Sequence, residues 1–467
     1  MNRIILFAII TLLLAGCTFS GEHSDLQRPN VVFILADDLG WSELGCYGNS
    51  FNETPNLDKL ARQGMRFTNA YASAPVCSPY RAALMTGQYP ARIGVTDYLR
   101  PDTDWHLPYA MITLAEIFKK AGYTTGMIGK WHLSGYDSDG VKSGPGKHGF
   151  DEVLISAQTG IGAGSYFHPY HKVSEKIKPV LGKKEYLTDR LNHEACEFIK
   201  RNKEAPFFLY LSHYAVHTAL DSKEKDLEYF SKKEGATQAL TRGTFKGMPT
   251  GEKGNPHIAS MLKTIDDGLG MVLNSLDELG LSENTVVIFT SDNGGEHWVT
   301  DNAPLRSGKS SLYEGGIREP LIVKWPGSTE ANSICHTPTA NVDFYPTFLD
   351  ITGMVSHQSH RIDGLSIVPL LKGKTLSPRS LYWHYPLAEP HFLGGKSSGA
   401  IRNGDWKLIE RFDNQPLELY NLADDKGEKM NLAGQYPERV RDLHKLLTEW
   451  RKDVSAKLPK DQDFTKP

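Results

Sequence analysis

Short apolar runs alternate with amphipathic helical patterns along most of the chain, and this alternation limits the possible folds more than any other feature. The runs typical of buried strands are residues 30–35, 124–128, 207–211 and 285–290. Apolar residues recur at helical spacing in residues 55–63, 112–120, 187–201 and 257–279. Strands that alternate with helices predict an α/β fold, in which helices sandwich a large, mixed and mostly parallel sheet.

The pattern changes near residue 375. Short aromatic-rich runs separated by turn residues occur at residues 381–385, 399–402, 406–411 and 417–420, and residues 437–452 then have helical spacing. A chain of 467 residues is long enough for a large and a small unit. We therefore predict a large domain over residues 29–374 and a small α+β subdomain with an antiparallel sheet over residues 375–467. The polar, glycine-rich residues 231–256 predict a long surface loop.

The N-terminus has the features of an export signal. Arg3 is followed by an apolar run over residues 4–14, which is too short to span a bilayer comfortably. The run ends in Leu-Ala-Gly-Cys at residues 14–17, which resembles the bacterial lipobox. This resemblance implies cleavage before Cys17, lipidation of its thiol and a tether over residues 18–28. We expect a protein anchored by lipid alone at a bacterial envelope membrane, in the periplasm or at the cell surface; the alternative is an ordinary signal peptide with a chance cysteine.

Charge and cysteine content exclude two classes of protein. The net charge of −3 does not provide the excess of positive charge that is typical of nucleic-acid-binding proteins. An anionic partner must therefore be held by a local cluster of cations. Besides Cys17 and Cys77, which have roles of their own, the cysteines are Cys46, Cys196 and Cys335. An odd number excludes a dense disulfide framework and leaves room for one bridge, with the pair undecided.

Polar residues follow each of the four predicted strands where the strand ends. They are Asp37 and Asp38, Lys130 and His132, His213 and His217, and Asp292 and Asn293. In open α/β sheets, ligands bind beyond the carboxyl ends of the strands. We therefore expect these side chains to meet in one crevice.

The acidic members of this set favour a hard cation. Asp37, Asp38, Asp292 and Asn293 offer oxygen donors, which suit Ca²⁺ or Mg²⁺ rather than zinc. Three carboxylates packed together would repel one another without a cation. Either pair alone is more typical of a helix cap or a turn; both pairs directly after buried strands favour metal binding.

Several cations accompany the acids: Arg81, Lys130, His132, His217 and Lys309. Lysine and arginine can hold the oxygens of an anionic ester, and a histidine can protonate a departing alcohol. Each of these residues alone is usually a solvated surface group. Lys309 lies in the glycine-rich loop of residues 306–318, whose spacing is not that of a phosphate-binding P-loop.

One segment resembles the signature of a known enzyme family. It reads Cys-Ser-Pro-Tyr-Arg at residues 77–81 and continues to Thr86 and Gly87, similar to the Cys-x-Pro-x-Arg and Thr-Gly of type I, formylglycine-dependent sulfatases in the alkaline phosphatase superfamily. Bacterial lipoprotein carbohydrate sulfatases and arylsulfatase A-like enzymes are the members it resembles. Further similar segments lie in the family's order at residues 36–40, 54–58, 129–132, 213–217, 291–294, 404–408 and 418–422.

The resemblance implies an alkaline-phosphatase-like fold, with the sulfatase catalytic domain in residues 29–374. It also implies that a formylglycine-generating maturation enzyme oxidises Cys77 to formylglycine (3-oxoalanine). The hydrated aldehyde would attack sulfur through one hydroxyl and, through the other, collapse to expel sulfate, which an ordinary serine could not do. Pro79, close behind Cys77, places this nucleophile at a helix N-terminus.

The resemblance also assigns the other residues. Residue 77 joins Asp37, Asp38, Asp292 and Asn293 as a metal ligand. The remaining implied roles are bracing of the aldehyde hydrate by Arg81, contacts from Lys130 and Lys309 to sulfate oxygens, assistance to the hydrate by His132 and protonation of the leaving oxygen by His217. His217 rather than His213 matches the family's x-x-His-Thr pattern.

One residue departs from the family signature. Its fourth position is usually Ser or Ala, and here it is Tyr80. The chemistry does not depend on this residue. The maturation enzyme reads the peptide unfolded, however, so a bulky ring would slow the conversion of Cys77.

Two other functions remain as alternatives. A phosphatase or phosphodiesterase can share the fold, although such enzymes usually use Thr or Ser and two zinc ions. The other alternative is a protein without catalytic activity that binds sulfated glycans. We expect a sulfated carbohydrate as substrate, because the lipobox places the chain where polysaccharide fragments arrive. The candidate specificity loops, which mix aromatics with His and Arg, are residues 97–106, 160–171, 231–256, 296–302 and 385–396.

Overall fold

The computed structural model describes residues 28–100, 105–134, 144–154, 166–170, 177–241 and 251–459. The predicted export signal with Cys17 lies outside these residues, as does nearly all of the predicted tether. Parts of three predicted specificity loops lie outside them too, namely residues 101–104, 160–165 with 171, and 242–250.

A sheet of nine strands forms the centre of the described molecule, in the order β4-β3-β5-β1-β6-β7-β2-β8, with β9 paired to β2. The strands β4, β3, β5, β1 and β6 run parallel, and β7 is antiparallel to both of its neighbours. Their bounds are β1 Asn30–Ala36, β2 Met65–Tyr71, β3 Thr124–Gly129, β4 Glu152–Leu154, β5 Phe207–Ser212, β6 Thr285–Ser291, β7 Arg318–Lys324, β8 Ser333–Cys335 and β9 Thr339–Ala340. The predicted mixed, mostly parallel sheet is confirmed.

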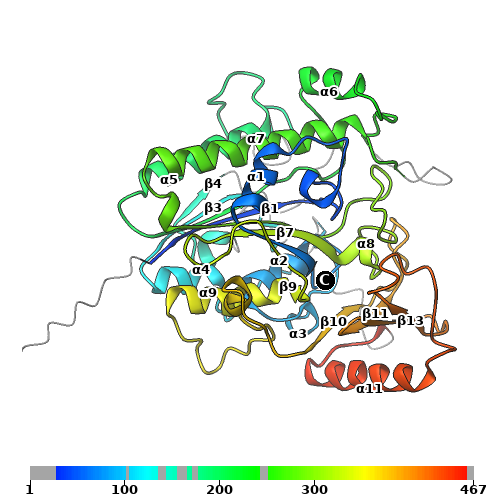
Figure 1. Cartoon of the computed structure of the whole chain (residues 1–467). Coiled ribbons are helices and arrows are strands. Elements are labelled where there is room, and N and C mark those ends of the chain that lie inside the picture. Colours follow the sequence, from blue (N-terminus) through cyan, green and yellow to red (C-terminus); the bar gives the residue numbers. More distant parts are fainter. Residues whose placement is uncertain are drawn as a thin grey trace, which may run out of the picture.

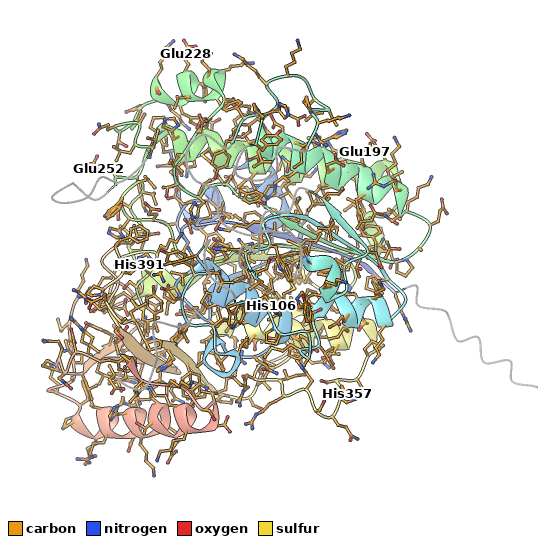
Figure 2. All side chains as sticks on the ribbon, turned by 180° about the vertical axis from the view of Figure 1, so that it is seen from behind. His106, Glu197, Glu228, Glu252, His357 and His391 are labelled. Atoms are coloured by element: carbon orange, nitrogen blue, oxygen red, sulfur yellow. The ribbon has the colours of Figure 1, made fainter. Side chains whose placement is uncertain are left out.

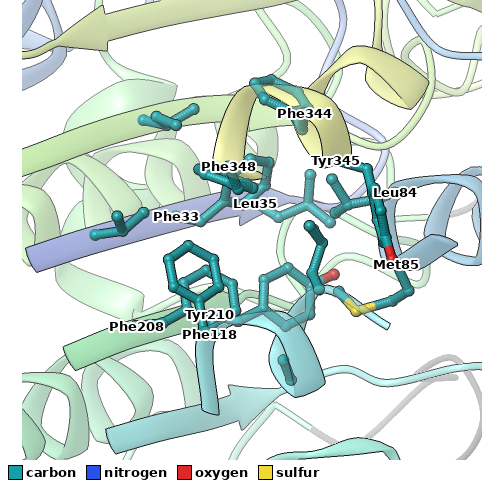
Figure 3. Close-up of a cluster of buried hydrophobic side chains, with 14 of the residues drawn as sticks. Phe33, Leu35, Leu84, Met85, Phe118, Phe208, Tyr210, Phe344, Tyr345 and Phe348 are labelled. Carbon is teal, nitrogen blue, oxygen red and sulfur yellow. The ribbon is translucent and has the colours of Figure 1, made fainter. Parts of the chain in front are cut away.

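Helices cover both faces of this sheet (Figure 1). One face carries α1 Pro55–Gln63, α5 Leu187–Arg201 and α7 Pro256–Glu278, and the other carries α2 Cys77–Thr86, α4 Leu114–Lys120 and α9 Phe344–Thr352. Alternate residues of β1 explain both layers: Val32 and Ile34 belong to the core under α5 and α7, whereas Phe33 and Leu35 point to the other. Figure 3 shows that second core, where Phe33 meets Phe344 and Phe348 of α9.

Charged residues occupy the outward faces of these helices. Glu197 of α5 and Glu228 of α6 point away from the body of the molecule (Figure 2), while Leu191, Ala195 and Phe198 of α5 are fully buried. In α5 this division is the amphipathic pattern from which the helix over residues 187–201 was predicted. The remaining short elements are η1 Gly45–Tyr47, α3 Pro90–Ile93, η2 Pro145–His148, α6 Glu224–Ser231, η3 Ser282–Asn284, α8 Glu314–Ile317, η4 Asn341–Asp343 and α10 Val368–Leu371.

A second, four-stranded antiparallel sheet lies at the C-terminal end, and we call it the C-terminal sheet. It consists of β10 Ser380–Tyr385, β11 Ser398–Asn403, β12 Trp406–Arg411 and β13 Glu418–Asn421. Helix α11, Pro437–Asp453, packs on it through Leu443 and Leu447. The predicted small antiparallel subdomain is thus confirmed as part of the fold, while its boundary at residue 375 stays a prediction.

The structure corrects the local predictions at three points. The helix predicted over residues 112–120 begins at Leu114, because Thr113 and Glu116 form a capping box ahead of it. Helix α6 was not predicted, and its last residue, Ser231, is the first residue of the predicted surface loop 231–256. The predicted surface loop 231–256 is packed at its far end, where Gly251 N donates to the His297 carbonyl at 2.7 Å.

The described residues contain no disulfide, since Cys46, Cys77, Cys196 and Cys335 are all free thiols. None of the helices in the described part of the chain combines the length and the apolar character that crossing a membrane requires.

Candidate active site

The ends of four parallel strands bring the predicted residues together. Strand β1 lies between β5 and β6, and β3 pairs with β5, so their carboxyl ends are neighbours. The backbone hydrogen bonding between neighbouring strands continues one residue past the strand ends. Asp292 N donates to the Ala36 carbonyl at 3.2 Å, and Lys130 N donates to the Ser212 carbonyl at 2.8 Å. The residues that follow the strands are therefore held by backbone hydrogen bonds.

Cys77 is the first residue of α2, and every residue of this helix is buried. Its Sγ lies 3.6 Å from Asp37 Oδ1 and 3.5 Å from Lys130 Nζ. Burial raises the pKa of the Cys77 thiol well above its usual range, so the unmodified side chain is a neutral and weak nucleophile.

Three carboxylates and this thiol form a compact, fully buried cluster. Single ligand atoms of Asp37, Asp38, Cys77 and Asp292 all lie within 4.8 Å of one another. Burial, followed by the charge of Asp292, raises the pKa of Asp37 to about 7, so three ionised acids are unfavourable here without a cation. We call these residues, together with Asn293, the carboxylate cluster.

The donor set fits a hard divalent cation. Asn293 Nδ2 donates to Asp38 Oδ1 at 2.7 Å, while the Oδ1 of Asn293 is buried with no hydrogen-bond partner. A buried amide oxygen of this kind and adjacent carboxylates are the ligands that Ca²⁺ and Mg²⁺ prefer.

Three basic side chains neutralise the carboxylate cluster. Arg81 donates to Asp292 Oδ2 from both Nε and Nη2, at 3.1 and 2.6 Å. Lys130 Nζ pairs with Asp37, and Lys309 Nζ lies 2.7 Å from Asp38 Oδ2. Although its own burial opposes it, the Asp38 carboxylate raises the pKa of Lys309 well above its usual range, so this ammonium stays charged.

Two histidines lie beside these charges as neutral imidazoles. His217 Nε2 is 3.7 Å from Asp38 Oδ2, and its Nδ1 bonds the Thr218 carbonyl. Burial and the Lys309 charge lower the pKa of His217 to about 3. His132 Nε2 bonds the Leu99 carbonyl at 3.0 Å, and its Nδ1 is buried with no hydrogen-bond partner. Burial and Lys130 lower its pKa well below the usual range.

His213 lies outside this group of side chains. Its Nε2 contacts Asn192 Oδ1 of α5 at 2.8 Å, and burial lowers its pKa to about 3. The other nine residues predicted for the site thus lie around Cys77, and the choice of His217 over His213 agrees with their positions.

Two site residues have strained backbones. Asp38 has φ +60° and His132 has φ +56°, a region that costs residues with a Cβ about 1 kcal/mol or more. Strain of this kind persists only where surrounding contacts hold it, and it is concentrated at functional sites.

Tyr80, which departs from the family signature, packs inside the protein with 1% of its surface exposed. Its ring belongs to the core shared with Phe344 and Phe348. Its hydroxyl, the Glu319 carboxyl and the Thr339 hydroxyl are buried beside a small cavity of about 10 Å³. Tyr80 is therefore a core residue of α2.

Sequence reasoning missed several residues that support the site. Ser212 accepts from Arg81 Nη1 at 2.7 Å, and Asn341 Nδ2 donates to the Tyr80 carbonyl at 2.8 Å and so holds α2. Glu296 accepts from Thr218 beside His217. Ser212 directly follows the predicted strand over residues 207–211 and could have been found from that position, whereas Asn341 is 261 residues from its partner and gives no local signal.

Three of the predicted specificity loops meet beside Lys309. Trp298 lies 6.0 Å from Phe392 between ring centroids, and Tyr98 lies 5.6 Å from His391. A Cβ at Gly395 would fall 1.8 Å from the Ser310 carbonyl oxygen, so the loop of residues 385–396 packs directly on the residue after Lys309. Burial, with Lys309 and Arg100 nearby, lowers the pKa of His391 to about 4. Figure 2 labels His391 on this loop.

Two family models match the chain. The sulfatase model matches residues 29–354, and the model of the C-terminal region of N-sulphoglucosamine sulphohydrolase matches residues 307–453. The first match alone spans well over half of the chain, including all ten predicted site residues.

Similar proteins include enzymes with different named substrates. Human N-acetylgalactosamine-6-sulfatase is 33% identical, over 78% of this chain and 70% of its own length. Human steryl-sulfatase is 31% identical, over 80% of this chain and 75% of its own length. Among solved structures, Ps i-CgsB in complex with k-i-k-neocarrahexaose is 30% identical with a TM-score of 0.79, covering 94% of this chain and 96% of that one.

Proposed function

Because this chain belongs to the sulfatase family, whose members hydrolyse sulfate esters, we propose that it removes sulfate from a sulfated carbohydrate with residue 77 as nucleophile. In this proposal Cys77 is converted to formylglycine, and one divalent cation, Ca²⁺ or Mg²⁺, binds Asp37, Asp38, Asp292, Asn293 and residue 77. The observation that carries it is the position of Cys77 at the start of α2, with its Sγ inside the carboxylate cluster.

Formylglycine and the cation would together supply an oxygen nucleophile at residue 77 and positive charge beside it. The protein fixes that position through Arg81, whose guanidinium is bound to Asp292, the Lys130 carbonyl and Ser212 and has no freedom to swing away. The start of α2 adds the partial positive charge of a helix N-terminus.

The lysines and histidines have complementary tasks. Lys130 and Lys309 present ammonium groups beside Asp37 and Asp38, where a sulfate bound next to residue 77 would be held by its oxygens. His217 bonds the Thr218 carbonyl through Nδ1, so the neutral ring carries its proton on that atom. Nε2 is therefore the atom that takes up a further proton and delivers it to the departing alcohol oxygen. His132 Nδ1 is available to accept a proton beside residue 77.

Support for a carbohydrate substrate comes from the aromatic residues beside Lys309 and from the structural relative, which was solved with k-i-k-neocarrahexaose. Aromatic rings such as Trp298 and Phe392 offer flat apolar faces on which sugar rings can stack. The steryl-sulfatase match shows that the family is not confined to sugars, so the assay must include a substrate that is not a sugar.

We also propose that the chain is exported and lipidated at Cys17. The support is the Leu-Ala-Gly-Cys sequence at residues 14–17. Metabolic labelling with a radioactive fatty acid tests it: label should enter the wild-type protein and be absent from Cys17→Ala, and an unlabelled wild-type protein would contradict it.

The central experiment combines mass spectrometry with a substrate panel. The protein is expressed with a formylglycine-generating enzyme, and the tryptic peptide of residues 67–81 is examined for the aldehyde in place of the thiol. Turnover is then measured on sulfated saccharides, an aryl sulfate, a steryl sulfate and the matching phosphate esters. We expect an aldehyde at residue 77 and sulfate release that is fastest from a saccharide.

Matched variants make the result decisive. Cys77→Ala and exhaustive chelation should each abolish turnover, whereas Cys196→Ala, a change at a thiol of α5 outside the site, should leave turnover unchanged. A converted protein that prefers phosphate esters would support a phosphatase, and one that binds sulfated glycans without turnover would support a binding protein. Either result would overturn the proposal.

A further inference from the structure

A buried group of charges joins the C-terminal sheet to the large sheet, and the proposed chemistry does not use it. Lys407 of β12 places its Nζ 2.8 Å from Glu314 Oε1 and 2.8 Å from Glu428 Oε1, and none of the three side chains is exposed to solvent. Arg318 Nε lies 2.7 Å from Glu314 Oε2, to which Tyr71 also donates. We call Lys407, Glu314, Glu428, Arg318 and Tyr71 the Lys407 cluster.

The Lys407 cluster is hydrogen-bonded to the Lys309 loop, residues 306–318, near both ends of the loop. Glu428 accepts from Glu314 N at 2.6 Å through its carboxylate and from Arg306 Nη1 at 3.0 Å through its backbone carbonyl. Gly315 N donates to the Arg306 carbonyl at 2.9 Å, which closes the chain between them into a ring. Lys309 lies on that ring, and α8, at its end, lies beside the C-terminal sheet in Figure 1.

The same loop touches the active site at three backbone positions. Lys309 N donates to the Gly295 carbonyl at 3.1 Å, and Gly294 N donates to the Gly316 carbonyl at 3.1 Å. Ser310 N donates to the carbonyl of Pro75, two residues before Cys77, at 2.8 Å. The loop therefore links the nucleophile, the residues after Asn293 and the Lys407 cluster.

Close packing makes this link stiff. A Cβ at Gly294 would fall 1.8 Å from the Gly315 carbonyl oxygen, and a Cβ at Gly316 would fall 2.1 Å from that of Ser311. Backbone segments packed at such distances cannot shift independently, so a displacement of Glu314 passes to the rest of the loop.

We infer that Lys407 is a positioning residue: from the C-terminal sheet, through Glu314 and Glu428, it sets the place of Lys309 and so the affinity of the site for sulfate. This inference rests on the proposed function, because it takes Lys309 to be a ligand of sulfate oxygens. It gives a role to the Gly-Asp-Trp-Lys-Leu motif at residues 404–408, which lies on a different sheet from the carboxylate cluster.

The matched control is a second set of ion pairs between the same two parts of the molecule. Asp453 at the end of α11 pairs with Arg92 at 2.7 Å and with Arg361 at 2.8 Å, and neither ion pair includes a residue of the Lys309 loop. Asp453→Asn therefore weakens the attachment of the C-terminal part without touching that loop.

The test measures four quantities for Lys407→Met, Glu428→Gln, Lys407→Arg and Asp453→Asn. They are KM and kcat on the best sulfate ester, the dissociation constant of inorganic sulfate from its stabilising effect on thermal unfolding, and hydrogen–deuterium exchange of residues 306–318. Glu428→Gln keeps the size of the side chain and still accepts from Glu314 N, so it serves if Lys407→Met does not fold. Lys407→Arg retains the positive charge.

We expect Lys407→Met and Glu428→Gln to raise KM and the sulfate dissociation constant together, by about tenfold, which is the loss of one charge-assisted hydrogen bond. Exchange of residues 306–318 should become faster, and Lys407→Arg should recover part of the affinity. Asp453→Asn should lower the unfolding temperature alone. The inference is overturned if the cluster variants also lower only that temperature and leave sulfate affinity and loop exchange at wild-type values.

The two proposals fail separately. Absence of sulfate release and of sulfate binding by the wild-type protein would overturn the proposed function. The exchange of residues 306–318 does not depend on activity, and an unchanged exchange rate in Lys407→Met and Glu428→Gln would overturn the coupling in an active enzyme.

Discussion

Arg81 shows how one buried side chain can maintain a site of like charges. Its guanidinium has no exposed surface and bonds to Asp292, the Lys130 carbonyl and Ser212. Removing one partner of a buried ion pair leaves the other charge without compensation, and this costs more than the pair contributes.

We therefore predict that Arg81→Ala lowers the free energy of unfolding by about 3–5 kcal/mol, the range for a broken buried ion pair. Urea denaturation of the metal-free protein measures it. Arg441→Ala, which removes a pair with Glu438 in which both side chains are over 70% exposed, should change it by less than about 1 kcal/mol. Equal effects of the two variants would contradict the description of Arg81.

A second prediction concerns protons and the cation. Burial and Asp292 raise the pKa of Asp37 to about 7, so this carboxyl is protonated below that pH and must lose its proton to bind a cation. The Ca²⁺ affinity should be nearly constant above pH 7 and fall by up to about tenfold for each pH unit below it, as for one displaced proton. Calorimetric titrations at several pH values, repeated in buffers of different ionisation enthalpy, test this. An affinity that is constant between pH 5.5 and 8.5 would contradict it.

Helix α2 is the element on which the site depends, and a tight contact defines its end. Gly87 has φ +67° and donates its N–H to the Ala83 carbonyl at 2.8 Å. A Cβ there would lie 2.5 Å from that of Tyr345, whereas a Cβ at Gly94, which has φ +86°, would meet nothing within 4 Å. These two glycines separate backbone strain from steric overlap.

Gly94→Ala should cost about 1–2 kcal/mol, the penalty for left-handed backbone with a Cβ. Gly87→Ala should lower the free energy of unfolding by about 1–3 kcal/mol more than Gly94→Ala does, because the side chain of Tyr345 must move. The two free energies of unfolding are compared under the same conditions. If both substitutions lower the free energy of unfolding by the same amount, steric overlap with Tyr345 does not contribute to the effect of Gly87→Ala.

Strands and helices were predictable where the pattern is local. The run of residues 30–35 became β1 with one residue added, because each of its side chains is buried on one face of the sheet or the other. The helix at residues 112–120 was placed too early, because Ile112 is apolar and its neighbour Thr113 acts as the cap. Apolar periodicity does not distinguish a cap from a first turn.

At the scale of the whole molecule, the two sheets share one core. Trp383 of β10 donates from Nε1 to the Ala72 carbonyl at 2.7 Å and packs against Tyr71 with the ring centroids 5.4 Å apart. Val76 and Ala83, on either side of Cys77 along the chain, belong to the same apolar cluster as Trp383. The C-terminal sheet therefore packs against the same apolar cluster that supports α2.

We predict that residues 29–374 do not fold alone. Deleting residues 375–467 would expose the apolar cluster that contains Val76 and Ala83 to water. It would also leave the buried Glu314 carboxylate without its partner Lys407. Calorimetry of the full-length protein should show one cooperative transition, and the fragment should aggregate or lack a transition. Two separate transitions, or a fragment that unfolds cooperatively, would instead support independent domains.

The sequence by itself determined the α/β class and the acids and cations at the strand ends, because these depend on local periodicity and on residues adjacent along the chain. The nucleophile proposed at residue 77 came from the resemblance of residues 77–81 to the family signature. Only the tertiary structure decided that His217 reaches Asp38 while His213 turns to Asn192, that Tyr80 is a core residue, and that Lys407 is joined to the Lys309 loop. Those outcomes depend on contacts between segments far apart in the chain, and a linear pattern carries no measure of which distant segments will meet or how closely they will pack.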